Sequence, residues 1–346
     1  MIKNTWTAQV TPFDPDGGID WEGLRKNISF QMSQGITGIV AVGTTGESPS
    51  LSWDEHNRVI AETISLCKGK VGVIAGTGSN CTGEAIESSR YAAGDGADGL
   101  LLVDCYYNGP SSSELRDEYY GRIAEAVPEA ECIPYIVPGR TGTSVQPADL
   151  ALLCRKYKNI NAVKEASGNK ENMKLTRRLC GDGFSIISGD DGLTCELILD
   201  KDIRCNGVIS VVSNIAPGAL SKMVSYALEG DREKAEALDK TLRPLHDIVG
   251  VAVENKRDIP GYGIVTVKDK YRNPLPTKVL MNVLGMPSGP ARPPLGRMSA
   301  EGLRVVRAAV SSVKENHPEI LAPVCDFYGV DAFARIEDDD IWNSML

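Results

Sequence analysis

The stretch Ile160-Asn161-Ala162-Val163-Lys164-Glu165-Ala166-Ser167-Gly168-Asn169 places a lysine at the end of a short apolar segment. The β-branched residues before the lysine predict a strand, and Ser-Gly-Asn predicts the turn that follows it. Lysine is seldom buried without a partner. If Lys164 points inward, burial favours its neutral amine, the nucleophile that Schiff-base chemistry on a ketone requires. The alternative is an ion pair with Glu165 or another carboxylate at the strand end, and this stretch alone leaves both open.

The same pattern of an apolar strand and a helical segment recurs through the first 230 residues. Strands are predicted over Thr5–Phe13, Ile36–Gly43, Val71–Gly78, Ala97–Cys105, Cys132–Val137, Ile160–Ala166, Phe184–Gly189 and Gly207–Val212. Helical segments follow them at Asp20–Gln34, Trp53–Cys67, Cys81–Ala93, Ser112–Ala126, Pro147–Tyr157, Asn169–Cys180, Leu193–Leu199 and Pro217–Glu229. Eight such units with nearly continuous apolar strands predict an α/β fold of the (β/α)8 TIM barrel type.

The sequence changes character after the eighth unit. Further helices are predicted over Asp231–Val249, Pro276–Leu284 and Ser299–Lys314, as a C-terminal helical appendage on the barrel. Between the first two, Glu254–Asn273 is rich in glycine, proline and charge, which favours a long loop.

We therefore divide the chain into a catalytic barrel at 1–230, a helical region at 231–314 and an atypical extension at 315–346. The extension carries Glu337-Asp338-Asp339-Asp340. Two interpretations of it remain open, a solvated end or an arm that packs on a neighbouring subunit.

Composition excludes several classes of function. The chain has 346 residues and a formal net charge of -9 without a Lys/Arg block, which argues against nucleic acid as a partner. Its nine cysteines form no C-x-x-C pair and its three histidines are far apart, so no metal site or other cofactor is expected. No apolar run approaches bilayer length and nothing resembles a signal peptide, so we expect a cytoplasmic protein that does not enter a membrane.

Chemistry in a barrel sits on the loops after the strands. Unusual residues gather at those ends: Gly43-Thr44-Thr45-Gly46-Glu47, Gly76-Thr77-Gly78, Tyr106-Tyr107-Asn108, Tyr135 through Thr141, Lys164, and Gly189-Asp190-Asp191. The first loop could hold a carboxylate or merely cap a helix. The tyrosines could move protons or simply pack, and Arg140 could bind a carboxylate or form a surface ion pair. Gly76-Thr77-Gly78 lacks the full spacing of a nucleotide loop, and Asp190-Asp191 suits loop ordering better than metal binding.

Together these motifs resemble the class I pyruvate aldolase family, which contains dihydrodipicolinate synthase and N-acetylneuraminate lyase. The resemblance runs from about Thr5 to Val313. It rests on Gly43 through Ser48, Tyr106-Tyr107-Asn108 with Pro110, Tyr135 with Val137 through Gly142, Lys164-Glu165-Ala166, Gly189-Asp190-Asp191, and Gly207 through Ser210. Thr-Thr-Gly-Glu-Ser and Gly-Arg-Thr-Gly are similar to the synthase branch, whereas Ile136 stands where that branch often has asparagine.

The resemblance implies a lyase that condenses pyruvate with L-aspartate 4-semialdehyde to 4-hydroxy-tetrahydrodipicolinate for lysine biosynthesis. It implies that Lys164 forms the imine and that Tyr135 is the general acid and base. Thr44 and Tyr107 would complete the proton relay. In the family this last tyrosine crosses a subunit interface, so a homodimer or homotetramer is implied.

The resemblance also implies the groups that bind substrate. Thr45 would hold the pyruvate carboxylate and Arg140 the semialdehyde carboxylate, while Ile209 and Gly189 would contribute to the pyruvate pocket. Six residues match a feedback lysine site in sensitive family members: Ser48, Trp53, His56, Asn80, Glu84 and Tyr106.

Two other functions are compatible with parts of the sequence. One is a sister aldolase or lyase that acts on a sugar acid or another aldehyde, against which Arg140 argues. The other is a barrel that binds a keto acid without converting it. A pure binder would not need the proton relay of Lys164, Tyr135, Thr44 and Tyr107, which argues against it.

Overall fold

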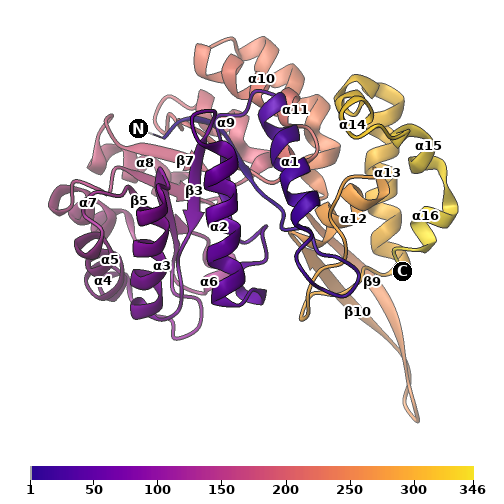
Figure 1. Cartoon of the computed structure of the whole chain (residues 1–346), viewed down its shortest axis with the longest axis horizontal. Helices are drawn as coiled ribbons and strands as arrows, with labels where there is room; N and C mark the ends of the chain where they lie inside the picture. The colour runs from indigo at the N-terminus through magenta and orange to yellow at the C-terminus, as the bar shows by residue number, and fades with distance from the viewer. Residues whose placement is uncertain (1) are drawn as a thin grey trace.

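The computed structural model of the protein describes residues 2–346, and its eight parallel strands close into a barrel (Figure 1). The strands are β1 (Asn4–Ala8), β2 (Gly38–Ala41), β3 (Gly72–Gly76), β4 (Gly99–Val103), β5 (Cys132–Ile136), β6 (Ala162–Glu165), β7 (Ser185–Ser188) and β8 (Gly207–Ser210). Each strand pairs with the next along the chain, and β8 pairs with β1 to close the ring. The predicted (β/α)8 barrel is confirmed.

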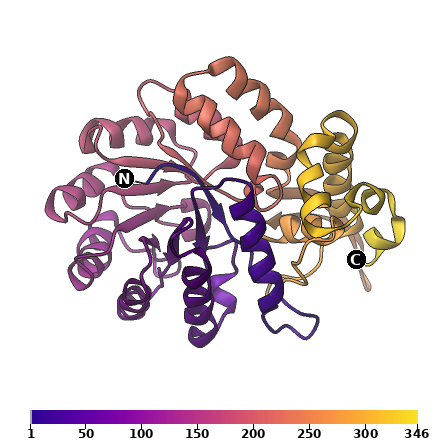
Figure 2. The same ribbon diagram turned by 45° about the horizontal axis from the view of Figure 1, so that its top comes forward.

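Helices between the strands cover the outside of the barrel (Figures 1 and 2). They are α1 (Trp21–Ser33), α2 (Trp53–Cys67), α3 (Thr82–Asp95), α4 (Ser112–Glu114), α5 (Gly121–Ala126), α7 (Pro147–Lys156), α8 (Lys170–Cys180), α9 (Thr194–Leu199) and α10 (Pro217–Glu229). A π-helical turn over Leu115–Tyr120 joins α4 to α5, and the short α6 (Pro138–Thr141) follows β5 directly. Ser52 and Glu55 form a capping box at the start of α2. Each side chain accepts a hydrogen bond from the other residue's backbone N–H, so two backbone donors at the helix start are satisfied.

Two apolar layers fill the structure because successive strand residues point to opposite sides. One layer lies inside the barrel and includes Trp6, Leu101 and Ala162. The other, much larger layer lies between the strands and the surrounding helices. Lys164 is two residues after Ala162, so it faces the barrel interior, whereas Glu165 faces the helices. Strand parity therefore places the lysine inside.

The first strand is shorter than predicted. It ends at Ala8, and the segment from Gln9 to Phe13 leaves the barrel towards the C-terminal part of the chain. The Val10 N–H donates to Oδ1 of Asn214, just after β8, at 3.1 Å, and the Phe13 N–H donates to the Ser288 carbonyl in the C-terminal part at 3.1 Å. The apolar residues of this segment are buried where it meets those parts of the chain. From the local sequence pattern alone, such a segment cannot be distinguished from a strand.

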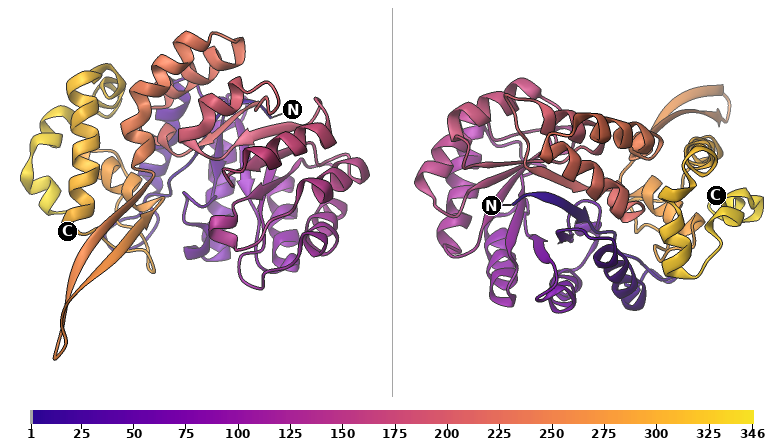
Figure 3. Two further views of the ribbon diagram at one scale, coloured as in Figure 1. Left: turned by 180° about the vertical axis from the view of Figure 1, so that it is seen from behind. Right: turned by 90° about the horizontal axis from the view of Figure 1, so that it is seen from above.

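The prediction of a long loop over Glu254–Asn273 is wrong, because most of this segment is β-strand. The strands β9 (Gly250–Ile259) and β10 (Gly263–Arg272) form an antiparallel hairpin that extends away from the barrel and the C-terminal helices (Figures 1 and 3). Pro260 and Gly261 occupy its turn, where Gly261 has φ +77° and the Tyr262 N–H donates to the Ile259 carbonyl at 2.9 Å. Proline followed by a left-handed glycine is a type II turn signal, which the charged composition of both strands obscured.

The three predicted C-terminal helices are confirmed as α11 (Arg232–Asp247), α12 (Leu275–Val283) and α13 (Ala300–Asn316). They stand with the C-terminal end at one side of the barrel (Figure 2). None of the helices in residues 2–346 has the length and apolar character needed to cross a membrane.

The extension is not a solvated end. It folds into α14 (Ala322–Tyr328), α15 (Ala332–Glu337) and α16 (Asp339–Asn343), which pack on their own chain. The Phe30 ring lies 5.2 Å from the Tyr328 ring, and the Tyr328 hydroxyl donates to Asn27 Oδ1 at 2.8 Å. Trp342 is buried, so the acidic run that precedes it is the solvated face of an ordered segment.

Candidate active site

A cavity of about 210 Å³ lies at the carboxyl ends of the barrel strands. Its walls are largely apolar, with a few polar groups that converge on it, as is typical of small-molecule sites. It is lined by Val42, Gly43, Thr44, Ser48, Pro49, Gly76, Gly78, Leu101, Val103, Tyr106, Tyr135, Val137, Arg140 and Thr141. Four of the predicted strand-end segments therefore meet in one place.

Lys164 lies beside Tyr135, because β5 and β6 pair these two residues directly. The Lys164 Nζ atom is 4.2 Å from the centre of the Tyr135 ring, and both side chains are about 6% exposed. Tyr135 also lines the cavity, so it connects the buried amine to the space where a substrate would sit. Glu165 turns to the opposite side, where its carboxylate accepts the Ser167 N–H at 2.7 Å. Pairing between Lys164 and Glu165 is therefore not the arrangement found.

Two residues predicted to shape the pyruvate pocket come from the end of β7 and from β8. A side chain at Gly189 would lie 2.9 Å from the Lys164 Cε atom, so the absence of one gives the lysine its room. Ile209 lies in the apolar interior of the barrel, opposite Trp6 in the β1–β8 register. Gly189 therefore lies beside the lysine side chain, and neither residue lines the cavity.

The loop after β2 is a compact turn. The Gly46 N–H donates to the Gly43 carbonyl at 3.0 Å, and the Glu47 N–H donates to the Thr44 carbonyl at 3.2 Å. Thr44 lines the cavity, whereas Thr45 is buried and its hydroxyl accepts a hydrogen bond from Asn273 Nδ2 at 2.9 Å. Of the two predicted threonines, one faces the cavity and the other anchors the loop.

Arg140 stands at the mouth of the cavity on the short helix α6. Its Nη2 atom donates to the Asn273 carbonyl at 2.8 Å, which leaves further guanidinium donors for a ligand. Arg272, at the end of the hairpin, donates to the Gly139 carbonyl at 2.6 Å. The root of the hairpin thus fixes the loop that carries Arg140.

The paired tyrosines after β4 have different surroundings. Tyr106 lines the cavity, and its N–H donates to Asn80 Oδ1 at 2.6 Å. Tyr107 does not line the cavity and is 87% exposed. Within a single chain, the predicted proton relay therefore lacks this tyrosine.

The six residues of the predicted lysine site lie close to the same cavity. Ser48 and Tyr106 line it, and the Trp53 and His56 rings are 5.2 Å apart on α2. Burial lowers the pKa of His56 to about 4, so this imidazole is neutral at neutral pH and would not repel an ammonium group. The Glu84 carboxylate accepts the Ser79 hydroxyl at 2.6 Å.

Two further motifs are structural. A side chain at Gly76 would lie 2.6 Å from the Val42 carbonyl, so glycine here allows neighbouring strand ends to approach closely. The Asp191 carboxylate accepts the Ser210 hydroxyl, as well as the Val211 N–H at 2.9 Å. This confirms loop ordering for the acidic pair. In residues 2–346, no three histidine, cysteine or acidic side chains gather as metal ligands.

Three residues near the site were missed from the sequence. Asn273 touches the loops of Thr45 and Arg140, and Lys278 and Arg292 bind the loop after β2. An isolated lysine in the otherwise uncharged Leu275–Val283 segment was a usable signal, because buried lysine needs a partner. Nothing local marks the other two.

Comparisons with known proteins agree with this geometry. Residues 1–259 match the model of the dihydrodipicolinate synthetase family. The chain belongs to this family. The 4-hydroxy-tetrahydrodipicolinate synthase of Methanocaldococcus jannaschii is 40% identical over 307 residues, which is 88% of this chain and 96% of that enzyme.

Solved structures of the family superimpose on most of the chain. One is the chloride-inhibited dihydrodipicolinate synthase from Acinetobacter baumannii complexed with pyruvate, with 35% identity, a TM-score of 0.80, and coverage of 90% of this chain and 98% of that one. Another is the synthase from Cyanidioschyzon merolae with lysine bound, with 32% identity, a TM-score of 0.80, and coverage of 90% and 97%.

A buried carboxyl group beneath the tyrosine turn gives a prediction about pH. Burial raises the pKa of Asp104 to about 7 from its ordinary 3.8, against the opposing effect of a Tyr120 hydroxyl that donates to Oδ1 at 2.5 Å. Between about pH 4 and 7 the unfolded chain has lost this proton and the folded chain has kept it. Stability therefore falls as pH rises through this window.

Asp104→Asn removes that titration and keeps the shape of the side chain. We expect the urea midpoint of the variant, relative to wild type, to be higher at pH 8 than at pH 4.5. Equal differences at the two pH values would contradict the assignment of a raised pKa to Asp104.

Proposed function

We propose that this chain catalyses the Schiff-base condensation of pyruvate with L-aspartate 4-semialdehyde to 4-hydroxy-tetrahydrodipicolinate. The observation that carries the proposal is the buried Lys164 amine against the ring of Tyr135, which lines a cavity together with Thr44 and Arg140. Family membership and the name of the Methanocaldococcus jannaschii relative support the same reaction.

The chemistry follows from the position of each group. The Lys164 amine adds to the pyruvate ketone and loses water to form an imine, while Tyr135 supplies and accepts the protons. Loss of a methyl proton from the imine gives an enamine, whose carbon attacks the aldehyde carbon of the second substrate. The amine of that substrate then attacks the imine carbon, which closes the ring and releases Lys164.

The two substrate carboxylates need separate anchors. In the proposed mechanism Thr45 and the amides of its loop bind the pyruvate carboxylate, and Ile209 and Gly189 shape the pyruvate pocket; Gly189 supports this because a side chain there would meet the Lys164 Cε atom. Arg140, at the cavity mouth, is suited to the carboxylate of the semialdehyde because a guanidinium binds carboxylates through two parallel hydrogen bonds.

Trapping of the intermediate tests the proposal. Borohydride reduction in the presence of pyruvate, followed by peptide mass spectrometry, should place one pyruvate adduct on Lys164. A coupled assay with aspartate semialdehyde should show turnover. An adduct without turnover would retain the aldolase chemistry and reject this aldehyde, and the absence of an adduct on Lys164 would reject the mechanism.

We propose that Tyr107 acts in the site of a second subunit, as the resemblance implies, in at least a homodimer. Its 87% exposure in one chain leaves the hydroxyl free for such a contact.

Subunit complementation tests this arrangement. Tyr107→Phe and Lys164→Met should each be nearly inactive alone, and mixing them under conditions of subunit exchange should restore activity. A mixed dimer then contains one site with both intact residues. If Tyr107 acted within its own chain, no mixture could recover activity.

We also propose that lysine inhibits the enzyme at Ser48, Trp53, His56, Asn80, Glu84 and Tyr106. The related Cyanidioschyzon merolae structure contains bound lysine. Titration with lysine should quench or shift Trp53 fluorescence and lower the rate, and unchanged activity at millimolar lysine would contradict the site.

The division of the chain into 1–230, 231–314 and 315–346 is proposed as a description of its parts, not of separable units. Asn273 and Lys278 from the second part reach the loop after β2. We therefore expect the barrel alone to be inactive.

A further inference from the structure

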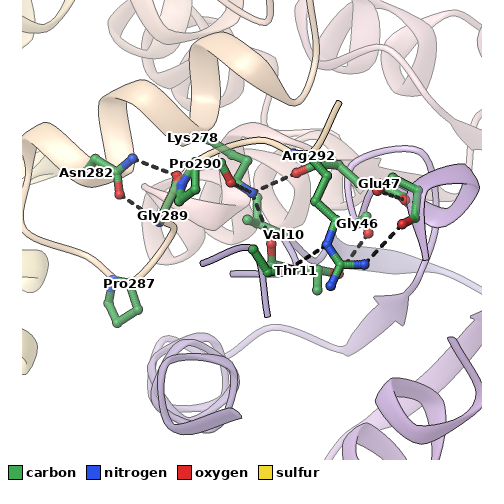
Figure 4. Close-up of polar contacts among 12 residues, drawn as sticks. Val10, Thr11, Gly46, Glu47, Lys278, Asn282, Pro287, Gly289, Pro290 and Arg292 are labelled. Atoms are coloured by element: carbon green, nitrogen blue, oxygen red, sulfur yellow. Dashed lines mark hydrogen bonds and ion pairs between the residues drawn. The ribbon is translucent and has the colours of Figure 1, made fainter. Parts of the chain in front are cut away.

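The loop that carries Thr44 and Thr45 ends in a buried ion pair. Lys278 Nζ donates to Glu47 Oε1 at 2.7 Å, to the Pro290 carbonyl at 2.8 Å and to the Thr11 carbonyl at 3.2 Å (Figure 4). All three donors of the ammonium are used. Both side chains are about 1% exposed, so the pair is shielded from solvent. Burial lowers the pKa of Lys278, and the charge of Glu47 opposes that effect.

A second contact holds the other oxygen of the same carboxylate. The Arg292 N–H donates to Glu47 Oε2 at 2.9 Å. The Arg292 guanidinium donates to the Ser50 carbonyl at 3.0 Å and binds both oxygens of Glu55 at 2.6 and 2.8 Å. These hydrogen bonds lower the pKa of Glu55 to about 2. Arg292 therefore holds the loop and the start of α2 together.

The loop needs such support because its backbone is strained at both ends. Val42 has φ +47° and Glu47 has φ +55°. A β-branched residue in the left-handed region is an outlier, because its side chain crowds the backbone there. Strain of this kind persists only where surrounding contacts impose it. Here the contacts come from Lys278, Arg292 and the Thr11 hydroxyl, which donates to the Gly46 carbonyl at 2.8 Å.

We propose that Lys278 and Arg292 are positioning residues for pyruvate binding, which hold the Val42–Glu47 loop in the strained shape that turns Thr44 and the loop backbone towards the cavity where the substrate carboxylate would bind. The proposal rests on the proposed function, in which this loop binds pyruvate. It assigns the C-terminal region a part in catalysis, because residues more than 230 positions away from Glu47 set the geometry of the first substrate site.

A purely structural role predicts something different. Removing one member of a buried ion pair leaves a lone charge and destabilises the fold, whereas removing both members is often tolerated. If Lys278 only stabilises the protein, replacing both partners should restore stability and pyruvate affinity together. If it positions the loop, stability should return and affinity should not.

The experiment compares Lys278→Met with the double variant Glu47→Gln/Lys278→Met. Two readouts are needed: the melting temperature, and the pyruvate concentration that gives half-maximal borohydride-trapped adduct. We expect the single variant to melt at a lower temperature and to need about tenfold more pyruvate or more, equivalent to about 1.4 kcal/mol. We expect the double variant to regain most of the melting temperature while its pyruvate requirement stays raised.

Arg335→Met is the matched control. Arg335 ties the same C-terminal region together through the Val283 and Asn282 carbonyls at 2.8 and 3.0 Å, but it does not contact the loop. It should lower the melting temperature without changing the pyruvate requirement.

A double variant with wild-type pyruvate affinity would overturn the proposal, as would an Arg335→Met variant with the same loss of affinity. The result stays interpretable if Lys278→Met fails to fold, because the double variant carries the decisive comparison. Wild-type protein that forms no pyruvate adduct would instead refute the proposed function.

Discussion

Lys164→Met is expected to yield no pyruvate adduct after borohydride reduction and to lose at least about 10⁴-fold in turnover. Losses of this size are typical when an enzyme that forms a covalent intermediate loses its nucleophile. Methionine keeps the length and apolar stem of the side chain, so it fills the space between Tyr135 and Gly189. It lacks the amine that forms the imine. Mass spectrometry of the trapped protein and the coupled assay measure the two effects.

The fold of this variant should remain intact. Replacing a buried amine by an apolar group of similar volume removes a desolvation cost, so the melting temperature should be unchanged or higher. Lys170→Met, which removes an exposed lysine that pairs with Glu196 on the surface, is the control and should form a normal adduct. A trapped adduct in Lys164→Met would show that another lysine is the nucleophile.

Tyr135→Phe should lower turnover by about 10²–10⁴-fold, the usual contribution of a positioned acid and base. The phenylalanine ring retains the contact with Lys164 Nζ, so the amine stays in place and borohydride still traps an adduct, more slowly. The rate of adduct formation and the steady-state rate should therefore both fall, with the melting temperature nearly unchanged.

The control removes a hydroxyl elsewhere. Tyr91 lies on α3 and is 40% exposed, so Tyr91→Phe should turn over at the wild-type rate. A near-normal rate in Tyr135→Phe would exclude this tyrosine from proton transfer and would point to a water molecule or another cavity residue.

Most of the barrel could be predicted because its signals are local. Apolar strands and amphipathic helices repeat within windows of about ten residues, and the carboxyl ends of parallel strands converge at one face. Thr44, Tyr106, Tyr135 and Arg140 were expected there and line one cavity. The stretch around Lys164 left its orientation open, and the structure places it inside because it shares the inner face of β6 with Ala162.

The hairpin and the folded state of the extension were not foreseen, for different physical reasons. Along the distal part of β9 and β10 most side chains face solvent, so the strands lack the apolar alternation that marks a half-buried sheet. The extension buries Tyr328 and Trp342 against its own chain, but short helices with few apolar residues resemble solvated ends.

The sequence by itself determined the barrel and the set of polar residues at the ends of its strands. Tertiary structure alone decided which groups hold that set in place: Asn273 on Thr45 and Lys278 on Glu47, across 228 and 231 residues. It also left Tyr107 outside its own cavity. The reason is physical. The periodicity of apolar residues shows which face of a helix or strand is buried. A contact between two distant polar groups involves only one residue in each segment, so it produces no periodic pattern in the sequence of either.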